Sequence, residues 1–246
     1  MTPKRYRPNL GKKIIVIPAR MASSRLPGKP MLEAADKPLV QWTYERAKAT
    51  EADHVIVATE DAEIAHHCQR TGMTWMLTTG DHQNGTSRAA EIIAKLKPEI
   101  RHGVSVVVNW QVDEPTVEPS DVDKLMAMRI SSIGTLVCVN RRAAFAIDDP
   151  NVTKVVWSCG RCHWFSRVPM RGAGFHVGLY SFTPFLLQAV SLLKSSRLSV
   201  LESLEQLTWI ENGFALAPVE IKQLPLSIDT LEDWMKFKQL KETQEG

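Results

Sequence analysis

The chain contains 246 residues, of which 44% are hydrophobic and 23% charged, as in an ordinary globular protein with a sizeable buried core. Its net charge of +3 is too small to indicate nucleic-acid binding by itself. No apolar run approaches the roughly 20 residues of a membrane-spanning helix. The cysteines form no dense disulfide framework, which favours a reduced, cytoplasmic compartment.

Residues 1–11 are basic and have no apolar segment behind them, so we expect a flexible lead-in rather than a secretory signal. Apolar strands then alternate with amphipathic helical segments. Strands are predicted at 14–17, 54–59, 74–79 and 104–113, and helices at 38–50, 60–72, 85–97 and 118–130. This alternation predicts an α/β fold with a mostly parallel sheet and helices on both faces. Ligands bind beyond the carboxyl ends of such strands, which places residues 18–30 and 111–115 on one rim.

The second half of the chain changes character. Further strands are predicted at 135–140, 154–158, 162–168, 175–182 and near 214–221, with helices at 183–194, about 201–212 and from residue 230. The helix near 201–212 has an apolar stripe made by Leu201, Leu204, Leu207 and Ile210. Since no linker separates the halves, we expect a mixed region built onto the first sheet, within a single domain over residues 12–246.

The loop after the first strand carries three cations within ten residues, Arg20, Arg25 and Lys29, with Ser23 among them. Backbone N–H groups after a parallel strand face outward, and small residues let a phosphate approach them. Arginine can bind phosphate oxygens in a bidentate fork, and lysine adds a point charge. The loop therefore suits a triphosphate, with a solvated basic loop as the alternative. It matches neither a Walker A loop nor GxGxxG.

Two aspartates are candidate metal ligands. Asp113 ends the strongest predicted strand, where its carboxylate could hold a divalent cation facing the phosphates. The alternative is a turn or N-cap carboxylate before Pro115. Asp229 precedes the last helix and could be either a second ligand or the helix N-cap. Glu114 is expected to point away from Asp113. Spacing alone leaves open whether the two aspartates meet.

Cys159 and Cys162 form a CxxC pair around Gly160. Such a pair can be half of a zinc site, but no second pair of suitable spacing accompanies it. We therefore favour a structural turn, which the glycine suits.

Several stretches occur together in a diagnostic order. They are IPARMASSRLPGKP, VIVATEDAEIA, GDHQNGTSRAAEI, DPNVTKVV, FSRVP, HVGLY, LESLEQLTWIENG and IDTLEDW. With this order, spanning about residues 13–238, the chain resembles the 3-deoxy-manno-octulosonate cytidylyltransferase (CMP-Kdo synthetase) family. The resemblance implies a three-layer α/β/α nucleotidyltransferase fold of Rossmann-like type. Within it, a nucleotide half would cover about 12–134 and a smaller sugar-binding and dimerisation region about 135–215.

The resemblance also implies a reaction, in which CTP and a 3-deoxy-2-ulosonic acid such as Kdo give the CMP-sugar and pyrophosphate for lipopolysaccharide biosynthesis. It implies Mg²⁺ as cofactor, a cytoplasmic homodimer, and neither nucleic-acid binding nor membrane insertion. Catalytic residues would be Arg20, Lys29, Asp113 and Asp229, the two aspartates binding Mg²⁺. Nucleotide-binding residues would be Ala19, Arg20, Ser23, Arg25, Lys29, Thr86, Arg88 and Gln111. Sugar-binding residues would be Gln111, Arg167, His176, Tyr180, Glu205 and Gln206. Taken without the resemblance, the last four would be outward-facing strand residues and a solvated helix face.

Three positions depart from the family pattern. Val112 stands where the family has glycine, Ser87 replaces an acidic residue, and the segment 168–174 is shortened. These changes lie on the sugar side, while the basic loop and both aspartates are intact. We therefore hypothesise that CTP activation is retained and that the sugar is Kdo or an amino-deoxy analogue. The alternatives are a nucleotidyltransferase for another sugar acid and a nucleotide-binding regulator without turnover.

Overall fold

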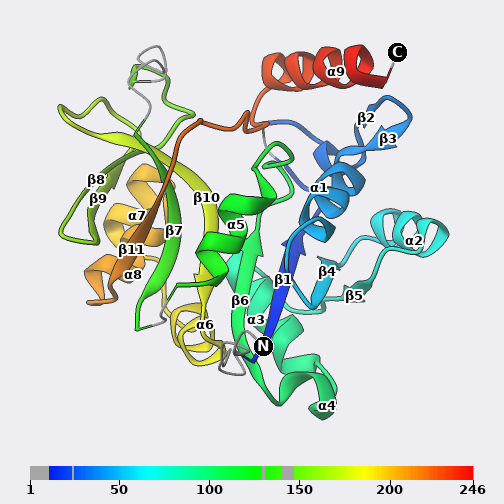
Figure 1. Cartoon of the computed structure of the whole chain (residues 1–246), viewed down its shortest axis with the longest axis horizontal. Helices are drawn as coiled ribbons and strands as arrows, with labels where there is room; N and C mark the ends of the chain where they lie inside the picture. The colour runs from blue at the N-terminus through cyan, green and yellow to red at the C-terminus, as the bar shows by residue number, and fades with distance from the viewer. Residues whose placement is uncertain (1–10, 24, 129–130, 140–146, 246) are drawn as a thin grey trace, which may run out of the picture.

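The computed structural model describes residues 11–23, 25–128, 131–139 and 147–245 (Figure 1). Within them runs a nine-stranded sheet in the order β5-β4-β1-β6-β10-β7-β11-β9-β8, beside a small hairpin of β2 and β3. The strands are β1 (Lys12–Pro18), β2 (Glu33–Ala34), β3 (Lys37–Pro38), β4 (His54–Thr59), β5 (Trp75–Leu77), β6 (Val104–Trp110), β7 (Ile133–Cys138), β8 (Lys154–Ser158), β9 (Arg161–Ser166), β10 (Gly174–Phe182) and β11 (Leu216–Ile221). Both halves of the chain therefore share one sheet.

The sheet is mixed rather than mostly parallel. Strands β5, β4, β1 and β6 are parallel, as the alternating sequence pattern predicts. Strand β10 then pairs antiparallel with β6, β7 and β8, and β8 and β9 form an antiparallel hairpin. Strand β11 is again parallel to β7. The prediction of a mostly parallel sheet is thus confirmed for the first half and wrong for the second, because β10 inserts in the opposite direction.

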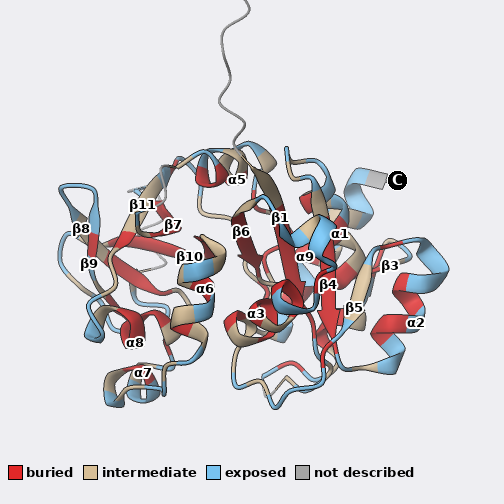
Figure 2. Cartoon of the chain, turned by 90° about the horizontal axis from the view of Figure 1, so that it is seen from below, coloured by how far each residue is buried: buried red, intermediate tan, exposed pale blue. Residues whose placement is uncertain are grey.

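Two hydrophobic cores cover the two faces of the sheet (Figure 2). Side chains of a strand alternate between faces, so Ile15 and Ile17 join one core while Ile14 and Val16 join the other. This explains why β1 reads as a continuous apolar run. The first core packs against α1 (Leu39–Lys48), α2 (Ala62–Thr71) and α5 (Pro119–Met126); the second packs against α3 (Gly85–Lys95), α6 (Pro184–Ser191) and α8 (Glu205–Glu211).

The remaining helices are η1 (Lys29–Met31), α4 (Pro98–Arg101), α7 (Arg197–Glu202) and α9 (Leu231–Glu245). Helix α9 returns to the first half of the chain, where Trp234 and Phe237 pack on Leu39 in a third small core. In Figure 1 it lies beside β2 and β3, far from the strand β11 that precedes it. The chain segment between β11 and α9 therefore crosses from one half of the molecule to the other.

The predicted helix near 201–212 is interrupted. Ser203 adopts a left-handed conformation with φ of 54°, which ends α7 before α8 begins. Because the chain turns there, the predicted apolar stripe is wrong at its first member: Leu201 is 68% exposed, whereas Leu204 and Leu207 are buried. The predicted helix 118–130 ends at Met126, and residues 129 and 130 lie outside the described residues, as does the lead-in 1–11 apart from Gly11.

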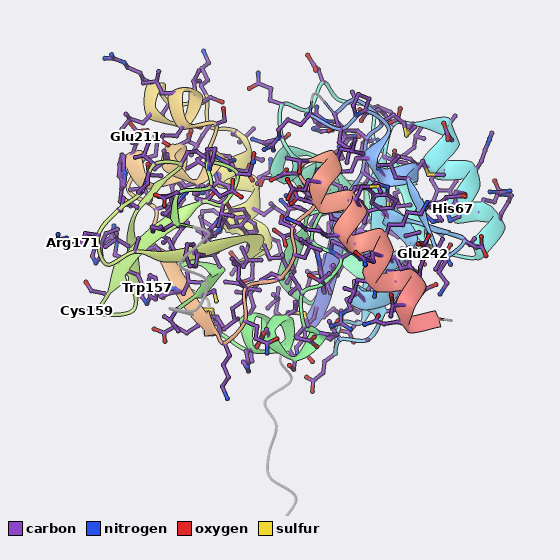
Figure 3. All side chains as sticks on the ribbon, turned by 90° about the horizontal axis from the view of Figure 1, so that it is seen from above. His67, Trp157, Cys159, Arg171, Glu211 and Glu242 are labelled. Carbon is purple, nitrogen blue, oxygen red and sulfur yellow. The ribbon has the colours of Figure 1, made fainter. Side chains whose placement is uncertain are left out.

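The CxxC pair occupies a hairpin turn. Cys159 and Gly160 both have positive φ, 50° and 72°, as a two-residue turn between β8 and β9 requires. Cys159 is exposed at the outer edge of the molecule (Figure 3), whereas Cys162 is buried and belongs to the second core. All four cysteines are free thiols, and no cluster of three metal-binding side chains occurs among the described residues. This geometry agrees with the structural turn.

No helix among the described residues has the length and apolarity needed to cross a lipid bilayer.

Candidate active site

The basic loop between β1 and η1 is fixed near both ends. The Met21 N–H donates to Asp61 Oδ2 over 2.8 Å, and the Gly28 N–H donates back to the Met21 carbonyl over 3.1 Å. Gly28 has a φ of 69°, which a side chain would disfavour. Between these points Leu26 is buried in the third core. These contacts fix the described residues of the loop around Met21 and from Leu26 to Gly28.

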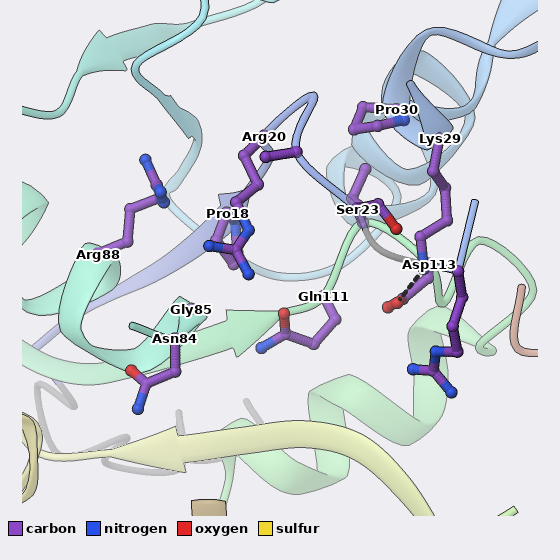
Figure 4. A pocket seen from close by; sticks show the side chains of 13 residues that line it. Pro18, Arg20, Ser23, Lys29, Pro30, Asn84, Gly85, Arg88, Gln111 and Asp113 are labelled. Carbon is purple, nitrogen blue, oxygen red and sulfur yellow. Dashed lines mark hydrogen bonds and ion pairs between the residues drawn. The ribbon is translucent and has the colours of Figure 1, made fainter. Parts of the chain in front are cut away.

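A pocket of about 240 Å³ lies beyond the carboxyl ends of β1 and β6 (Figure 4). Its lining joins the basic loop, the N-terminus of α3 and the turn after β6. The lining residues are Pro18, Arg20, Ala22, Ser23, Arg25, Lys29, Pro30, Asn84, Gly85, Arg88, Gln111, Val112 and Asp113. The structure thus brings residues 18–30 and 111–113 together on one rim, as the sequence predicts.

Lys29 is the centre of the acidic part of this pocket. Its Nζ lies 2.7 Å from Asp113 Oδ2 and 3.7 Å from Asp229 Oδ1, and it donates to the Ile228 carbonyl over 2.8 Å. Lys29 itself is only 8% exposed. Asp113 and Asp229, distant in sequence, therefore converge on one point beside the basic loop.

Asp229 does not cap the last helix. The Thr230 hydroxyl accepts from the Asp233 N–H over 3.2 Å, and Asp233 Oδ2 accepts from the Thr230 N–H over 2.9 Å. This reciprocal capping box satisfies the start of α9. Asp229 Oδ1 instead accepts from Arg25 over 2.8 Å. The N-cap alternative is wrong for Asp229, whose carboxylate lies outside the pocket lining but contacts two of the lining cations, Arg25 and Lys29.

The Asp113 and Asp229 carboxylates repel each other electrostatically. Burial raises the pKa of Asp229 above its ordinary value, and the neighbouring Asp113 carboxylate raises it further, while Lys29 and Arg25 oppose both effects. Additional positive charge at this point would relieve the repulsion between the two carboxylates. The arrangement is therefore suited to receiving a cation.

The two arginines of the basic loop differ in their contacts. Arg25 joins the two halves of the chain, because it pairs with Asp229 and also donates to Asn151 Oδ1 over 3.3 Å. Arg20 is exposed on the pocket wall and forms no ion pair with any described residue. Arg20 is thus the cation most available to an incoming anion.

Three other predicted nucleotide-binding residues, Ala19, Thr86 and Arg88, differ in whether they line the pocket. Ala19 is buried outside the lining, and its N–H donates to the Ala58 carbonyl. Thr86 is also outside the lining, with its hydroxyl accepting from Asn109 Nδ2 over 3.1 Å. Arg88 does line the pocket, although its guanidinium contacts Glu60 and Thr78, and burial lowers its pKa.

The predicted sugar-binding residues gather in a second, closed cluster around β10. The His176 and Tyr180 rings lie 5.4 Å apart, and Tyr180 meets the Trp209 ring at 4.8 Å. His176, Tyr180 and Gln206 are all less than 9% exposed, so the outward-facing alternative is wrong for them. Burial raises the pKa of Glu205 to about 7. Apart from Gln111, none of the six predicted residues lines the pocket.

Arg167 is held at the junction of the halves. Its guanidinium donates to the Asn151 carbonyl over 2.7 Å, and its backbone N–H donates to Glu202 Oε2 over 2.8 Å. The buried ammonium of Lys154 donates to the Arg167 carbonyl over 3.0 Å. Burial lowers the pKa of Arg167. The side chain is thus oriented before any ligand arrives.

Asn109 and Glu114 were not named as site residues from the sequence, although both are buried next to the proposed site. Asn109 is fully buried opposite Tyr180 in the β6–β10 ladder. Glu114 is 5% exposed, and burial followed by the Asp113 charge raises its pKa to about 8. Its carboxyl group contacts the Ser227 hydroxyl and the Gly178 N–H, whereas that of Asp113 contacts Lys29, so the two neighbours have different partners, as predicted. A polar residue inside the apolar run VSVVVNW is the one signal that could have identified Asn109.

Protonation of His176 gives a testable pH effect. Its pKa is lowered to about 3 by burial and then by Arg167, against 6.5 in an exposed histidine. Between these values the unfolded chain binds a proton that the folded chain does not, so stability falls as pH falls through this window. We expect the free energy of unfolding in urea to fall by up to about 1.4 kcal/mol per pH unit from His176 alone.

The His176→Gln variant should lose this contribution and show a shallower decline between about pH 6 and about pH 4. Equal slopes for the variant and the parent chain would contradict the assignment. His102→Gln, which makes the same substitution at an exposed histidine, provides the matched control.

Comparison with known proteins identifies the family. The family model for cytidylyltransferases matches residues 14–223. A 3-deoxy-manno-octulosonate cytidylyltransferase of Marinobacter nauticus is 35% identical, with 93% of this chain and 96% of that protein aligned. The chain belongs to the 3-deoxy-manno-octulosonate cytidylyltransferase family.

Other relatives agree. The mitochondrial 3-deoxy-manno-octulosonate cytidylyltransferase of Arabidopsis thaliana is 34% identical over 92% of this chain and 81% of that protein. A solved structure of CMP:2-keto-3-deoxy-manno-octonic acid synthetase complexed with CTP superposes with a TM-score of 0.83 at 34% identity, covering 96% of this chain and 100% of that one. An inositol-1-phosphate CTP transferase of T. maritima, 14% identical, shares the fold with a TM-score of 0.68. The chain is therefore a cytidylyltransferase enzyme with an α/β fold.

The departures from the family pattern have visible consequences. Val112 is 8% exposed; it packs in the first core, lines the pocket, and its carbonyl accepts from Thr43 Oγ1 over 2.7 Å. Ser87 lies at the start of α3, where its N–H donates to the capping Asn84 and its hydroxyl contacts His82. Val112 therefore lies in the wall of the pocket that contains the basic loop, and Ser87 contacts residues next to that pocket, so the expectation that both departures lie on the sugar side is wrong for Val112.

Proposed function

We propose that the enzyme transfers CMP from CTP to the anomeric hydroxyl of a 3-deoxy-2-ulosonic acid, Kdo or an amino-deoxy analogue. The anomeric oxygen forms a bond to the α-phosphorus, the bond from that phosphorus to the bridging oxygen breaks, and pyrophosphate leaves. The hydroxyl proton passes to solvent. The observation that carries the proposal is the convergence of Asp113 and Asp229 on Lys29 beside the basic loop.

Each side of the pocket has a distinct task in this reaction. Arg20, Arg25 and Lys29 hold the triphosphate and neutralise the charge that develops on the leaving pyrophosphate. Gln111 lies in the middle of the pocket (Figure 4), which supports a role for it at the boundary between nucleotide and sugar. Since no covalent enzyme intermediate is needed, catalysis rests on positioning and charge neutralisation.

The donor set of Asp113 and Asp229 fits Mg²⁺. Magnesium prefers hard oxygen ligands and is usually held by one or two carboxylates together with substrate phosphates. Two carboxylates that meet at one point and repel each other supply that requirement. When bound, Mg²⁺ would neutralise phosphate charge and orient the triphosphate for in-line displacement.

The sugar pocket would be formed by Arg167, His176, Tyr180, Glu205 and Gln206 together with Gln111. Their gathering around β10 supports this assignment, although the cluster is closed in the ligand-free chain. Val112 is bulkier than the glycine of the family pattern, and this difference supports an acceptor sugar other than unmodified Kdo. Turnover with CTP against a panel of 2-keto sugar acids tests this preference, and fastest turnover with unmodified Kdo would remove its basis.

We further propose a homodimer in the cytoplasm. Large exposed apolar side chains on α6 and α7 support an interface there; they are Phe185, Leu192, Val200 and Leu201. Free thiols agree with a reduced compartment.

The two cores on opposite faces of the sheet support a three-layer, Rossmann-like description, with a nucleotide half over about 12–134 and a sugar-binding and dimerisation region over about 135–215.

Release of pyrophosphate tests the reaction directly. The purified enzyme with CTP, Mg²⁺ and a sugar acid should release pyrophosphate and form the CMP-sugar in equal amounts. Omission of either the acceptor or Mg²⁺ should abolish the release. CTP binding without turnover across the whole acceptor panel would overturn the proposal in favour of a nucleotide-binding regulator.

A further inference from the structure

Four buried side-chain atoms have no hydrogen-bond partner among the described residues. They are Asn109 Oδ1, Glu114 Oε2, Glu205 Oε2 and Gln206 Nε2. A buried polar atom without a partner is costly, so such atoms in one region mark a place where something else binds. Asn109 Oδ1 is an acceptor and Gln206 Nε2 is a donor, whereas a carboxyl oxygen of Glu114 or Glu205 accepts when ionised and donates when protonated. Such a set can bond the hydroxyl groups of a sugar acid.

These atoms lie around Tyr180. Asn109 is the direct partner of Tyr180 in the β6–β10 ladder. The Thr86 hydroxyl links Asn109 to Glu205, because it accepts from the first and donates to the second. Glu114 is tied to the same strand two residues before Tyr180, through the Gly178 N–H. The unpartnered atoms thus come from β6, the turn after it and α8, and the residues of three of them, Asn109, Glu114 and Glu205, are linked to one stretch of β10.

Glu114 is held by one of its two carboxylate oxygens. Oε1 accepts from the Ser227 hydroxyl over 2.9 Å and from the Gly178 N–H over 3.4 Å. The second donor is available because β10 bulges against β7 between Val177 and Tyr180, which takes Gly178 out of that ladder. The carboxylate is therefore fixed in orientation while Oε2 is left without a partner.

Gly178, which has no side chain, lies beside this carboxylate. A Cβ built on Gly178 would make only ordinary contacts, 3.6 Å from Glu114 Oε1 and 3.8 Å from Gln111 Cγ. Gln111 also lines the nucleotide pocket, so its side chain contacts both that pocket and the Gly178 face. A shift of Gln111 would therefore expose Glu114 and the Gly178 face to the pocket.

We propose that Glu114, with the open face of Gly178, forms a further part of the acceptor site, in which Glu114 Oε2 accepts a hydrogen bond from one hydroxyl of the sugar acid. This rests on the proposed function, since it names a contact to the acceptor of that reaction. Gln111 moves aside when the acceptor binds, and the hydroxyl then supplies the partner that Oε2 lacks. Glu114 is in this way a specificity-determining residue separate from the aspartate pair that faces the phosphates.

The Glu114→Gln variant tests the contact. Its amide oxygen keeps the bonds from Ser227 and Gly178, so its NH₂ group replaces Oε2 and cannot accept a hydrogen bond. In assays at about pH 9, where a carboxyl group with a pKa of about 8 is ionised, the KM for the sugar acid should rise about tenfold, while the KM for CTP changes less than about twofold. Glu118→Gln is the matched control, because Glu118 pairs with Arg46 on the surface. An unchanged acceptor KM in Glu114→Gln would overturn the proposal.

A set of monodeoxy sugar acids separates contact from general disturbance. With the analogue that lacks the contacted hydroxyl, the parent enzyme should lose the same factor in KM, and Glu114→Gln should lose nothing further. Equal sensitivity of the variant to every analogue would mean that Glu114 has only a structural role. Pyrophosphate release by the parent enzyme is measured alongside, because its absence would sink the proposed function rather than this inference.

Gly178→Ala provides a second test that leaves Glu114 intact. The added methyl group makes only ordinary contacts in the ligand-free chain, so the melting temperature should not fall appreciably. The methyl group would instead occupy space needed by the acceptor, and the KM for the sugar acid should rise about tenfold. An unaltered acceptor KM in this variant would place the sugar elsewhere and overturn the assignment.

Discussion

Replacing Asp113 by Asn should lower kcat for pyrophosphate release by about 10³-fold while leaving the fold intact. The amide is the same size as the carboxylate but carries no charge to bind a cation. Lys29 keeps its bonds to the Ile228 carbonyl and its contact with Asp229, so the melting temperature should change little. Steady-state pyrophosphate release with saturating CTP, sugar acid and Mg²⁺ measures the effect.

Asp123→Asn is the matched control for this change. Asp123 accepts from the Glu51 N–H on the surface, away from the pocket, so its replacement should leave kcat unchanged. Asp113→Asn turnover close to that of the control would show that Asp113 neither binds a cation nor faces the phosphates. Retained CTP binding in the absence of Mg²⁺ would show that the nucleotide pocket is still formed.

Replacing Lys29 by Met should lower both the turnover and the stability of the enzyme. Turnover should fall by about 10²-fold or more, because a buried cation that faces the triphosphate is lost. Stability should also fall, by about 3 kcal/mol, since Asp113 and Asp229 are left as neighbouring carboxylates without their shared partner. Urea unfolding measures the second effect independently of activity.

The effect of Mg²⁺ on the melting temperature is a more specific test of the same variant. If the two aspartates hold the metal, millimolar Mg²⁺ should raise the melting temperature of Lys29→Met more than that of the parent enzyme. Lys236→Met is the control, because Lys236 forms only an exposed pair with Glu232. A melting temperature of Lys29→Met that is insensitive to Mg²⁺ would contradict metal binding at this pair.

The sequence predicted the nucleotide pocket better than the rest of the molecule. Its elements are local: an apolar strand, a loop that needs Gly28, and a strand that ends before Asp113. The parallel order of β4, β1 and β6 then places these loops on one rim. The pairing of Asp113 with Asp229 was an expectation from family resemblance, and only the folded chain brings Lys29 between them.

Long-range features were beyond the sequence. A mixed region was expected in the second half, but no pattern in residues 174–182 shows that β10 runs antiparallel between β6 and β7. Asp229 and Thr230 are both suitable N-caps by residue type, and the choice depends on the reciprocal bond with Asp233. Glu114 was expected only to point away from Asp113, because its burial depends on Ser227, more than a hundred positions away.

The position of Asp229 along the chain has a consequence for biosynthesis. The Ile228 N–H donates to the Asp113 carbonyl. The segment that carries Ile228 and Asp229 is anchored by α9, which packs on residues near the N-terminus of the chain in the third core. Synthesis proceeds from the N-terminus, so the triphosphate loop gains its packing partners Ile228, Trp234 and Phe237 only when the last residues emerge. An incomplete polypeptide would therefore lack both the second carboxylate and the packing of this loop, and competence for transfer would arrive in one step with the final helix.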